Sequence, residues 1–161
     1  MIRRLLLVAS LLPWTTGLAQ QARSAAPAAP PLQDAEWTIP DRRLDFYAGL
    51  RSNGDTDFMT GVKYSRRLPS ARRFAGAGFL EVTFSDPTLY ILGGLLQFMP
   101  LHRLLLETGP GVALNGGSEF LWRVCAEYEL QIDRLLLIPK VYVDFVDGTS
   151  VVGYGIAIGR R

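Results

Sequence analysis

The sequence predicts an all-β fold, an eight-stranded antiparallel up-and-down transmembrane β-barrel preceded by a signal peptide and a linker. Three observations lead to this fold class. Eight segments alternate between apolar and polar or small residues, which is the period of a β-strand. Only short clusters rich in Gly, Pro, Asn, Asp and Ser join them. The bulky apolar residues share one face of the strands, and the charged and small residues share the other.

The first 42 residues are predicted to precede the barrel. Residues 1–19 carry two arginines, a short apolar run and a small-residue end, which indicates a secretory signal peptide. The run is too short to span a bilayer. Residues 20–42 are rich in Ala and Pro without apolar periodicity and are interpreted as a periplasmic linker. The barrel domain is therefore expected to cover residues 43–161.

Strand-like alternation continues from about residue 43 to the end of the chain, and no segment after the signal peptide has a helical period. The predicted strands are 43–51, 57–67, 73–84, 88–98, 102–113, 119–131, 135–145 and 150–160. The segments between them, such as "SNGDT", "LNGGS" and "VDGT", have hairpin length. Eight sequential strands joined by short turns form a meander, which hides its edges by closing into a barrel.

The segment "FLWRVCAEYEL" at 120–130 poses the question of which strand face is inside the barrel. Two barrels fit the alternation: a soluble lipocalin-like barrel with an apolar interior, and an outer-membrane barrel with a polar one. The charged face also carries most of the Gly and Ala residues, including Gly49, Gly61, Gly153 and Gly155. Eight strands enclose room for few large side chains, so the small residues belong inside. The bulky face is predicted to contact lipid.

The aromatic residues of the bulky face support this choice because they cluster toward the two ends of the strands. Such banding is typical of a membrane barrel, whose aromatic girdles lie at the two interfaces. The predicted girdle residues are Phe58, Phe84, Tyr90, Phe120, Trp122 and Phe145 toward one end, and Tyr64, Phe74, Phe98 and Tyr128 toward the other.

The charged face predicts an ion cluster in the interior of the barrel. Its members are Lys63, Glu81, Glu107, Arg123, Glu127, Glu129, Lys140 and Asp144. The hairpin turns are expected to bring Glu107 beside Glu127 and Glu127 beside Lys140, with Lys140 and Arg123 neutralising the two carboxylates. The complete inward set, which also includes Asp45, Arg51 and Arg103, holds about six acids and five bases. This near balance favours a lumen plugged by its own ion pairs over an ion-selective pore.

Prolines and one strongly apolar strand are the irregular features. Pro110 and Pro139 fall inside predicted strands, and a β-bulge is expected at "GPG" because proline cannot donate to the ladder. The segment "LYILGGLLQFM" is apolar on both faces. Either Leu89, Ile91 and Leu95 pack inside, or the adjacent Gly93 and Gly94 break the register.

The C-terminal third, from "LLLETGPG" to "VYVDFVDGTSVVGYGIAIG", resembles the small outer-membrane β-barrel proteins of Gram-negative bacteria, the broad OmpA/OmpX-like superfamily. The chain departs from their pattern by ending on Gly159-Arg160-Arg161 instead of an aromatic residue. The resemblance implies the bacterial outer membrane as location, with outer-membrane lipid including lipopolysaccharide and the outer-membrane assembly machinery as partners. A monomer is expected, and the formal charge of +2 gives no nucleic-acid signature.

Catalytic residues are not evident in the sequence. Lipid-modifying barrels rely on a His that works with a Ser, but the single histidine, His102, falls at a turn, and Ser65, Ser118 and Ser150 have no predicted His neighbour. Cys125 is interpreted as a packing residue, and no cofactor or metal motif is found. The preferred function is a non-enzymatic outer-membrane barrel with a structural or interaction role. The alternatives are a deacylase-like or acyltransferase-like barrel enzyme and a secreted lipocalin-like binder.

Overall fold

The computed structural model describes residues 39–132 and 135–160. The predicted signal peptide and most of the predicted linker lie outside these ranges. No helix among the described residues is long and apolar enough to cross a membrane. The strands are β1 (Arg42–Asn53), β2 (Asp55–Leu68), β3 (Ala71–Phe84), β4 (Leu89–Leu101), β5 (Leu104–Leu114), β6 (Ser118–Tyr128), β7 (Leu130–Ile132), β8 (Leu135–Val146) and β9 (Thr149–Arg160).

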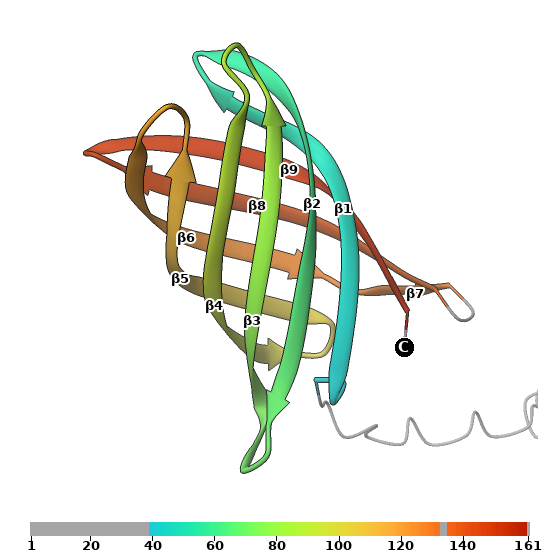
Figure 1. Ribbon diagram of the computed structural model, residues 1–161. Helices are drawn as coiled ribbons and strands as arrows, with labels where there is room; N and C mark the ends of the chain where they lie inside the picture. The colour runs from blue at the N-terminus through green and yellow to red at the C-terminus, as the bar shows by residue number, and fades with distance from the viewer. Residues whose placement is uncertain (1–38, 133–134, 161) are drawn as a thin grey trace, which may run out of the picture. The chain divides into compact units, whose positions relative to one another are not determined.

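These strands form one closed antiparallel barrel, as predicted (Figure 1). From β1 to β6 each strand pairs with the next in sequence, as β8 does with β9, and β1 pairs with β9 to close the wall. Strands β6 and β7 both pair with β8 in one unbroken register, because Glu127 lies opposite Lys140 and Leu130 lies opposite Leu137. They are therefore two parts of a single strand interrupted at Glu129, and the barrel has eight strands.

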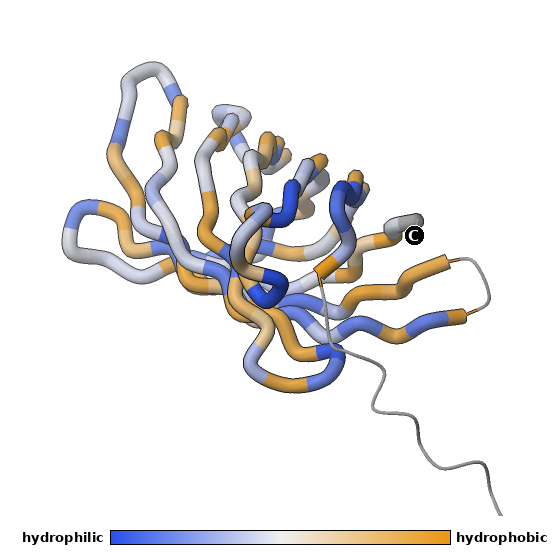
Figure 2. The backbone as a smooth tube through the Cα atoms, turned by 90° about the horizontal axis from the view of Figure 1, so that it is seen from below, coloured by the Kyte–Doolittle hydropathy of each residue, from blue (hydrophilic) through white to orange (hydrophobic). Residues whose placement is uncertain are grey.

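The bulky face of every strand lies on the outside of the barrel. Phe46 and Phe120 are 62% and 64% exposed, whereas Leu121 and Arg123, which point inward, are almost completely buried. The same alternation is visible as a change between apolar and polar residues along the strands in Figure 2. Burying charge while exposing large apolar side chains inverts the arrangement of a water-soluble protein.

The two strand prolines are accommodated without the expected bulge. Strand β5 keeps one register with β4 on both sides of Pro110, but the paired positions pass from Gly93–Gly111 directly to Leu96–Thr108. The prediction of a β-bulge at "GPG" is therefore wrong. Because proline lacks an N–H, the ladder is interrupted on one side only, and Pro110 still pairs with Trp122 on the other. Pro139 likewise faces the interruption between β6 and β7.

The turn between β4 and β5 lies three residues later than predicted. Strand β4 continues through Leu101, and His102 and Arg103 form the turn, with Arg103 at a positive φ of 70°. Arg103 is therefore exposed at the end of the barrel and does not join the interior charges. In β4 itself, Ile91 and Leu95 pack inside the barrel and the register with β3 is continuous.

Glycines of the inner face make room for aromatic side chains of the lumen. A Cβ atom built at Gly61 would lie 2.4 Å from the ring of Tyr47, and one at Gly153 would lie 2.2 Å from the ring of Tyr142. The two tyrosine rings therefore lie flat against the barrel wall where it has no side chains. This arrangement explains why the small residues and the charged residues fall on the same face of the strands in the sequence.

Candidate functional site

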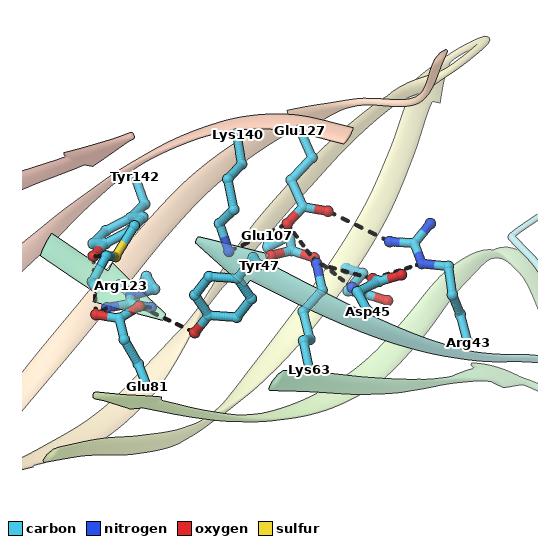
Figure 3. Close-up of polar contacts among 12 residues, drawn as sticks. Arg43, Asp45, Tyr47, Lys63, Glu81, Glu107, Arg123, Glu127, Lys140 and Tyr142 are labelled. Atoms are coloured by element: carbon cyan, nitrogen blue, oxygen red, sulfur yellow. Dashed lines mark hydrogen bonds and ion pairs between the residues drawn. The ribbon is translucent and has the colours of Figure 1, made fainter. Parts of the chain in front are cut away.

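The polar lumen is the candidate site, and we call the two ends of the barrel the loop end and the terminal end. The loop end carries the turns that join β1 to β2, β3 to β4, β5 to β6 and β8 to β9. The terminal end is the opposite end, where β1 begins and β9 finishes. Buried charges form one group nearer each end, and Figure 3 shows Tyr47 between the two groups.

The loop-end group consists of Arg51, Glu81, Arg123 and Asp144, and Arg123 is its centre. The Arg123 guanidinium donates Nε and Nη2 to the two oxygens of Asp144, at 2.6 and 2.8 Å. It also donates Nη1 and Nη2 to the two oxygens of Glu81, at 2.9 and 3.1 Å. Asp144 is the direct cross-strand neighbour of Arg123, whereas Glu81 reaches it from β3. One planar cation thus holds two carboxylates, both in a forked geometry.

Aromatic rings complete the environment of this guanidinium. The Arg123 Cζ atom lies 3.8 Å from the ring centre of Tyr142 and 4.4 Å from that of Phe79. The hydroxyl groups of Tyr142 and Tyr47 donate to the Glu81 carboxylate at 2.9 and 3.1 Å. Because Arg123 and Glu81 are both fully buried, these donors and rings replace the water that each charge has lost.

The terminal-end group consists of Arg43, Asp45, Lys63, Glu107, Glu127, Glu129 and Lys140. Lys63 crosses the lumen from β2, and its Nζ lies 2.6 Å from Glu107 Oε1 and 2.5 Å from Glu127 Oε1. Lys140 is farther from the same Glu127 oxygen, at 3.6 Å, and its ammonium lies 4.0 Å from the ring centre of Tyr47. The Lys63 ammonium is therefore the main link between β2 and the opposite wall.

Arg43 extends this group toward the terminal end. Its Nε lies 2.8 Å from Asp45 Oδ2, its Nη2 lies 3.4 Å from Glu127 Oε2, and its Nη1 contacts Glu129. These partners belong to β1, to β6 and to the residue between β6 and β7. The long side chain of Arg43 thus connects the first strand to a distant part of the wall through buried ion pairs.

Apolar clusters lie beside the charges at several levels of the lumen. One, formed by β3, β4, β5, β6 and β8, contains Phe79, Ile91, Leu95, Ala113, Leu121 and Val146. Another contains Ala75, Met99, Leu105 and also Ile39, which precedes β1 and is 1% exposed. Ile39, which falls within the predicted linker, thus contributes to the lumen filling. Charges and apolar side chains together occupy the lumen.

One trio of buried side chains has the geometry of a metal site. Ligand atoms of Glu107, Cys125 and Glu127 lie within 4.8 Å of one another. The Lys63 ammonium, however, already contacts one oxygen of each carboxylate. It supplies the positive charge that a metal ion would otherwise bring. Cys125 packs in the apolar cluster with Tyr47, Met59 and Tyr142, so its thiol serves as filling between the two charged groups.

The structure places all eight residues of the predicted ion cluster in the lumen. Those residues are Lys63, Glu81, Glu107, Arg123, Glu127, Glu129, Lys140 and Asp144. Glu127 lies opposite Lys140 as expected, but Glu107 lies opposite Cys125 and not Glu127. Arg123 does not join the two glutamates, because it is bound to Glu81 and Asp144 in the other group.

Sequence reasoning omitted several lumen residues from the cluster. Arg43, Tyr47 and Tyr142 are central to the network, and Gln97 donates to Glu107. Arg43 and Tyr47 share the odd-number parity of Asp45, so the alternation contained the signal for both. The predicted inward set and the lumen residues that the structure describes contain the same number of bases, but the predicted set included Arg103, which is exposed, and lacked Arg43, which is buried.

The predicted girdle residues lie on the outer surface in two bands. Phe58 and Phe84 are cross-strand neighbours near the loop end, and their rings stack with centres 5.8 Å apart. Phe74 and Phe98 form the corresponding stacked pair near the terminal end, at 4.8 Å. The other members near the loop end are Tyr90, Phe120, Trp122 and Phe145, and those near the terminal end are Tyr64 and Tyr128; all are exposed.

Comparisons with solved structures find barrels of the same fold. The Neisserial surface protein A is 11% identical with a TM-score of 0.50, and the match covers 74% of this chain and 94% of that one. The outer-membrane protein Ail of Yersinia pestis is 9% identical with a TM-score of 0.51, covering 74% and 98%. A de novo designed transmembrane β-barrel is 14% identical with a TM-score of 0.54, covering 76% and 98%. At these identities the likeness shows the fold alone.

Sequence comparisons add no relative. No protein-family model matches the chain. No curated protein matches it either.

Proposed function

We propose that the chain is a non-enzymatic outer-membrane β-barrel protein of the OmpA/OmpX-like kind, with a structural or interaction role and a lumen closed by its own ion pairs. The observation that carries this proposal is the inverted distribution of side chains. Large apolar residues cover the outside, whereas Lys63, Glu81 and Arg123 are completely buried inside. A closed barrel of this kind satisfies its backbone groups within a bilayer and presents an apolar surface to lipid.

The filled lumen supports a closed barrel over a transporting or ligand-carrying one. A lipocalin-like binder needs an apolar cavity for its ligand, but the interior here is occupied by paired charges and tyrosine rings. A selective ion pore would present charge of one sign to water. In this lumen acids and bases neutralise each other within hydrogen-bond distance.

The positions of the histidine and the serines support a non-enzymatic role. His102 is exposed in the turn between β4 and β5 at the terminal end, where Arg103 donates to its Nε2 at 3.0 Å. Ser118 and Ser150 are exposed at the loop end, and Ser65 is buried in the lumen. A general base must lie within hydrogen-bond reach of its nucleophile. The loop-end serines lie at the opposite end of the barrel from the only histidine.

Partners follow from the proposed location. The exposed apolar bands would contact outer-membrane lipid, including lipopolysaccharide, and insertion would require the outer-membrane assembly machinery. The short turns at the loop end, such as Gly54 between β1 and β2 and Asp147–Gly148 between β8 and β9, offer little surface for a large protein ligand. We expect a monomer, because β1 to β6, β8 and β9 each pair with a strand on both sides within the barrel.

Fractionation tests the proposed location. Expressed from its full sequence in a Gram-negative host, the protein should sediment with outer membranes and resist carbonate extraction. It should also migrate differently on gels before and after boiling, since a closed barrel stays folded in cold detergent. Recovery as a soluble periplasmic monomer would contradict the proposal and favour the lipocalin-like alternative.

Conductance measurements on the same purified protein test the closed lumen. In planar bilayers we expect no steady open-channel current, because paired charges and apolar clusters occupy the lumen at several levels. An ohmic conductance that persists at low voltage would show that the lumen conducts. The barrel location would then stand, but the plugged interior would be wrong.

A charge on the outer face tests the lipid contact. Val124 is exposed in the middle of β6. Val124→Arg should therefore cost about 2–4 kcal/mol of folding free energy in lipid vesicles, because an arginine at mid-bilayer depth is poorly solvated. Val124→Leu is the matched control and should change the urea midpoint little. Equal midpoints for the arginine variant and the wild type would refute the assignment of this face to lipid.

A further inference from the structure

Exposed charges at the two ends of the barrel differ in sign. The turns and strand ends of the loop end carry acids and, among the described residues, no exposed base: Asp55, Asp86, Glu119 and Asp147 are exposed, and Asp57 is half-buried. The terminal end carries mainly arginines: Arg42, Arg66, Arg72, Arg73 and Arg103 are exposed, and Arg67 is half-buried. Tyr64, Phe74 and Tyr128 on the adjacent outer surface mark the level at which lipid headgroups would begin.

Two of these arginines face each other directly. Arg42 in β1 is the cross-strand partner of Arg66 in β2, and both are exposed on the outer side of the wall. Like charges directly opposite in an antiparallel ladder destabilise it. In residues 39–132 and 135–160 neither side chain forms an ion pair, and the nearby Asp41 is bound to Arg67. An anion between the two guanidinium groups would remove the repulsion.

An apolar groove begins beside this pair. It has a volume of about 400 Å³ and runs on the outer surface near the seam of β1 and β9. Arg42 and Arg43 line its charged end, and the other lining residues are Leu44, Phe46, Tyr64, Leu135, Ile158 and Gly159. A cationic rim that continues into an apolar groove matches a molecule with an anionic head and a hydrocarbon tail.

We propose that this surface is a binding site for an anionic glycerophospholipid, with the phosphate between Arg42 and Arg66 and an acyl chain along the groove. Guanidinium groups bind phosphate oxygens through paired N–H donors. In a zwitterionic headgroup, the ammonium group offsets the negative charge of the phosphate and so weakens its attraction to the arginines. The proposal rests on the membrane location proposed above. Because the predicted periplasmic linker precedes β1, we expect the terminal end to face the periplasmic leaflet. It adds a specific lipid contact to that location.

Short-chain lipid titration tests the site without depending on where the protein resides. The full-length barrel, folded in maltoside micelles, is titrated by calorimetry with dioctanoyl phosphatidylglycerol or dioctanoyl phosphatidylcholine. We expect the wild type to prefer phosphatidylglycerol. An arginine near anionic lipid contributes roughly fivefold in affinity, so R42Q/R66Q should lose about 25-fold for phosphatidylglycerol. Its affinity for phosphatidylcholine should not change.

Arg73→Gln is the matched control, because it removes an exposed arginine from the same end but outside the groove. Its phosphatidylglycerol affinity should stay within about twofold of the wild type, whereas an equal loss would show a diffuse charge effect and overturn the site. Inorganic phosphate at millimolar concentration should not displace the lipid. Full displacement would reduce the site to an anion contact without the acyl groove.

Different results would contradict the lipid site and the membrane location. Wild-type affinity in R42Q/R66Q, with the variant still showing the heat-dependent gel shift of a folded barrel, overturns the lipid site alone. Recovery of the wild type in the soluble periplasm overturns the membrane location, whatever the titration shows.

Discussion

Arg123→Met should lower the free energy of unfolding by about 3–5 kcal/mol, a large part of the roughly 5–15 kcal/mol that stabilises a typical protein. The substitution removes the cation that holds both Glu81 and Asp144. Arg51 would remain as their partner, but only at 3.5 and 3.0 Å through a single nitrogen. Two carboxylates in a confined lumen would then lack most of their compensation.

Urea unfolding in detergent measures this loss. Arg73→Met is the control for removing an arginine, and it should change stability by no more than about 0.5 kcal/mol because Arg73 is exposed. Adding Asp144→Asn to Arg123→Met should recover part of the loss, since the second change removes one of the stranded charges. If the single variant unfolds at the wild-type midpoint, the network does not stabilise the barrel.

The alternation of the sequence predicted the facing of nearly every residue because the period of a strand is fixed by backbone geometry. Short turns also limit the register, so Glu127 opposite Lys140 could be derived by counting. Ion pairing could not be derived in this way. Lys63 bridges Glu107 and Glu127 from the other side of the lumen, and a flexible side chain of that length has partners that depend on the curvature of the whole barrel.

The sequence also misplaced the end of one strand. The predicted strands 88–98 and 102–113 put a turn at "MPL", residues 99–101, but Pro100 is part of β4 and the turn is formed by His102 and Arg103. This shift moved Arg103 out of the lumen. Sequence patterns locate such boundaries only within a few residues. Arg43, by contrast, already lies within the predicted strand 43–51 and has the inward parity of Asp45, so the alternation alone places it in the lumen.

Gly49→Ala should disrupt the closure of the barrel. Gly49 in β1 lies opposite Gly155 in β9, at the seam that joins the first strand to the last. A Cβ atom at position 49 would lie 2.2 Å from the carbonyl oxygen of Tyr154 and 2.6 Å from the Cα of Gly155. Both are backbone atoms, which cannot move aside without separating β1 from β9. We expect a loss of about 3 kcal/mol or more, beyond the usual cost of overpacking.

Gly76→Ala is the matched control because it adds the same methyl group to the same kind of strand. A Cβ atom at Gly76 in β3 would meet no atom within 4 Å. Its heat-dependent gel shift and urea midpoint should therefore stay close to those of the wild type, whereas Gly49→Ala should show a reduced folded fraction and a lower midpoint. Equal behaviour of the two variants would show that the β1–β9 seam tolerates a wider spacing, and that the glycines of the inner face are not required for the barrel to close.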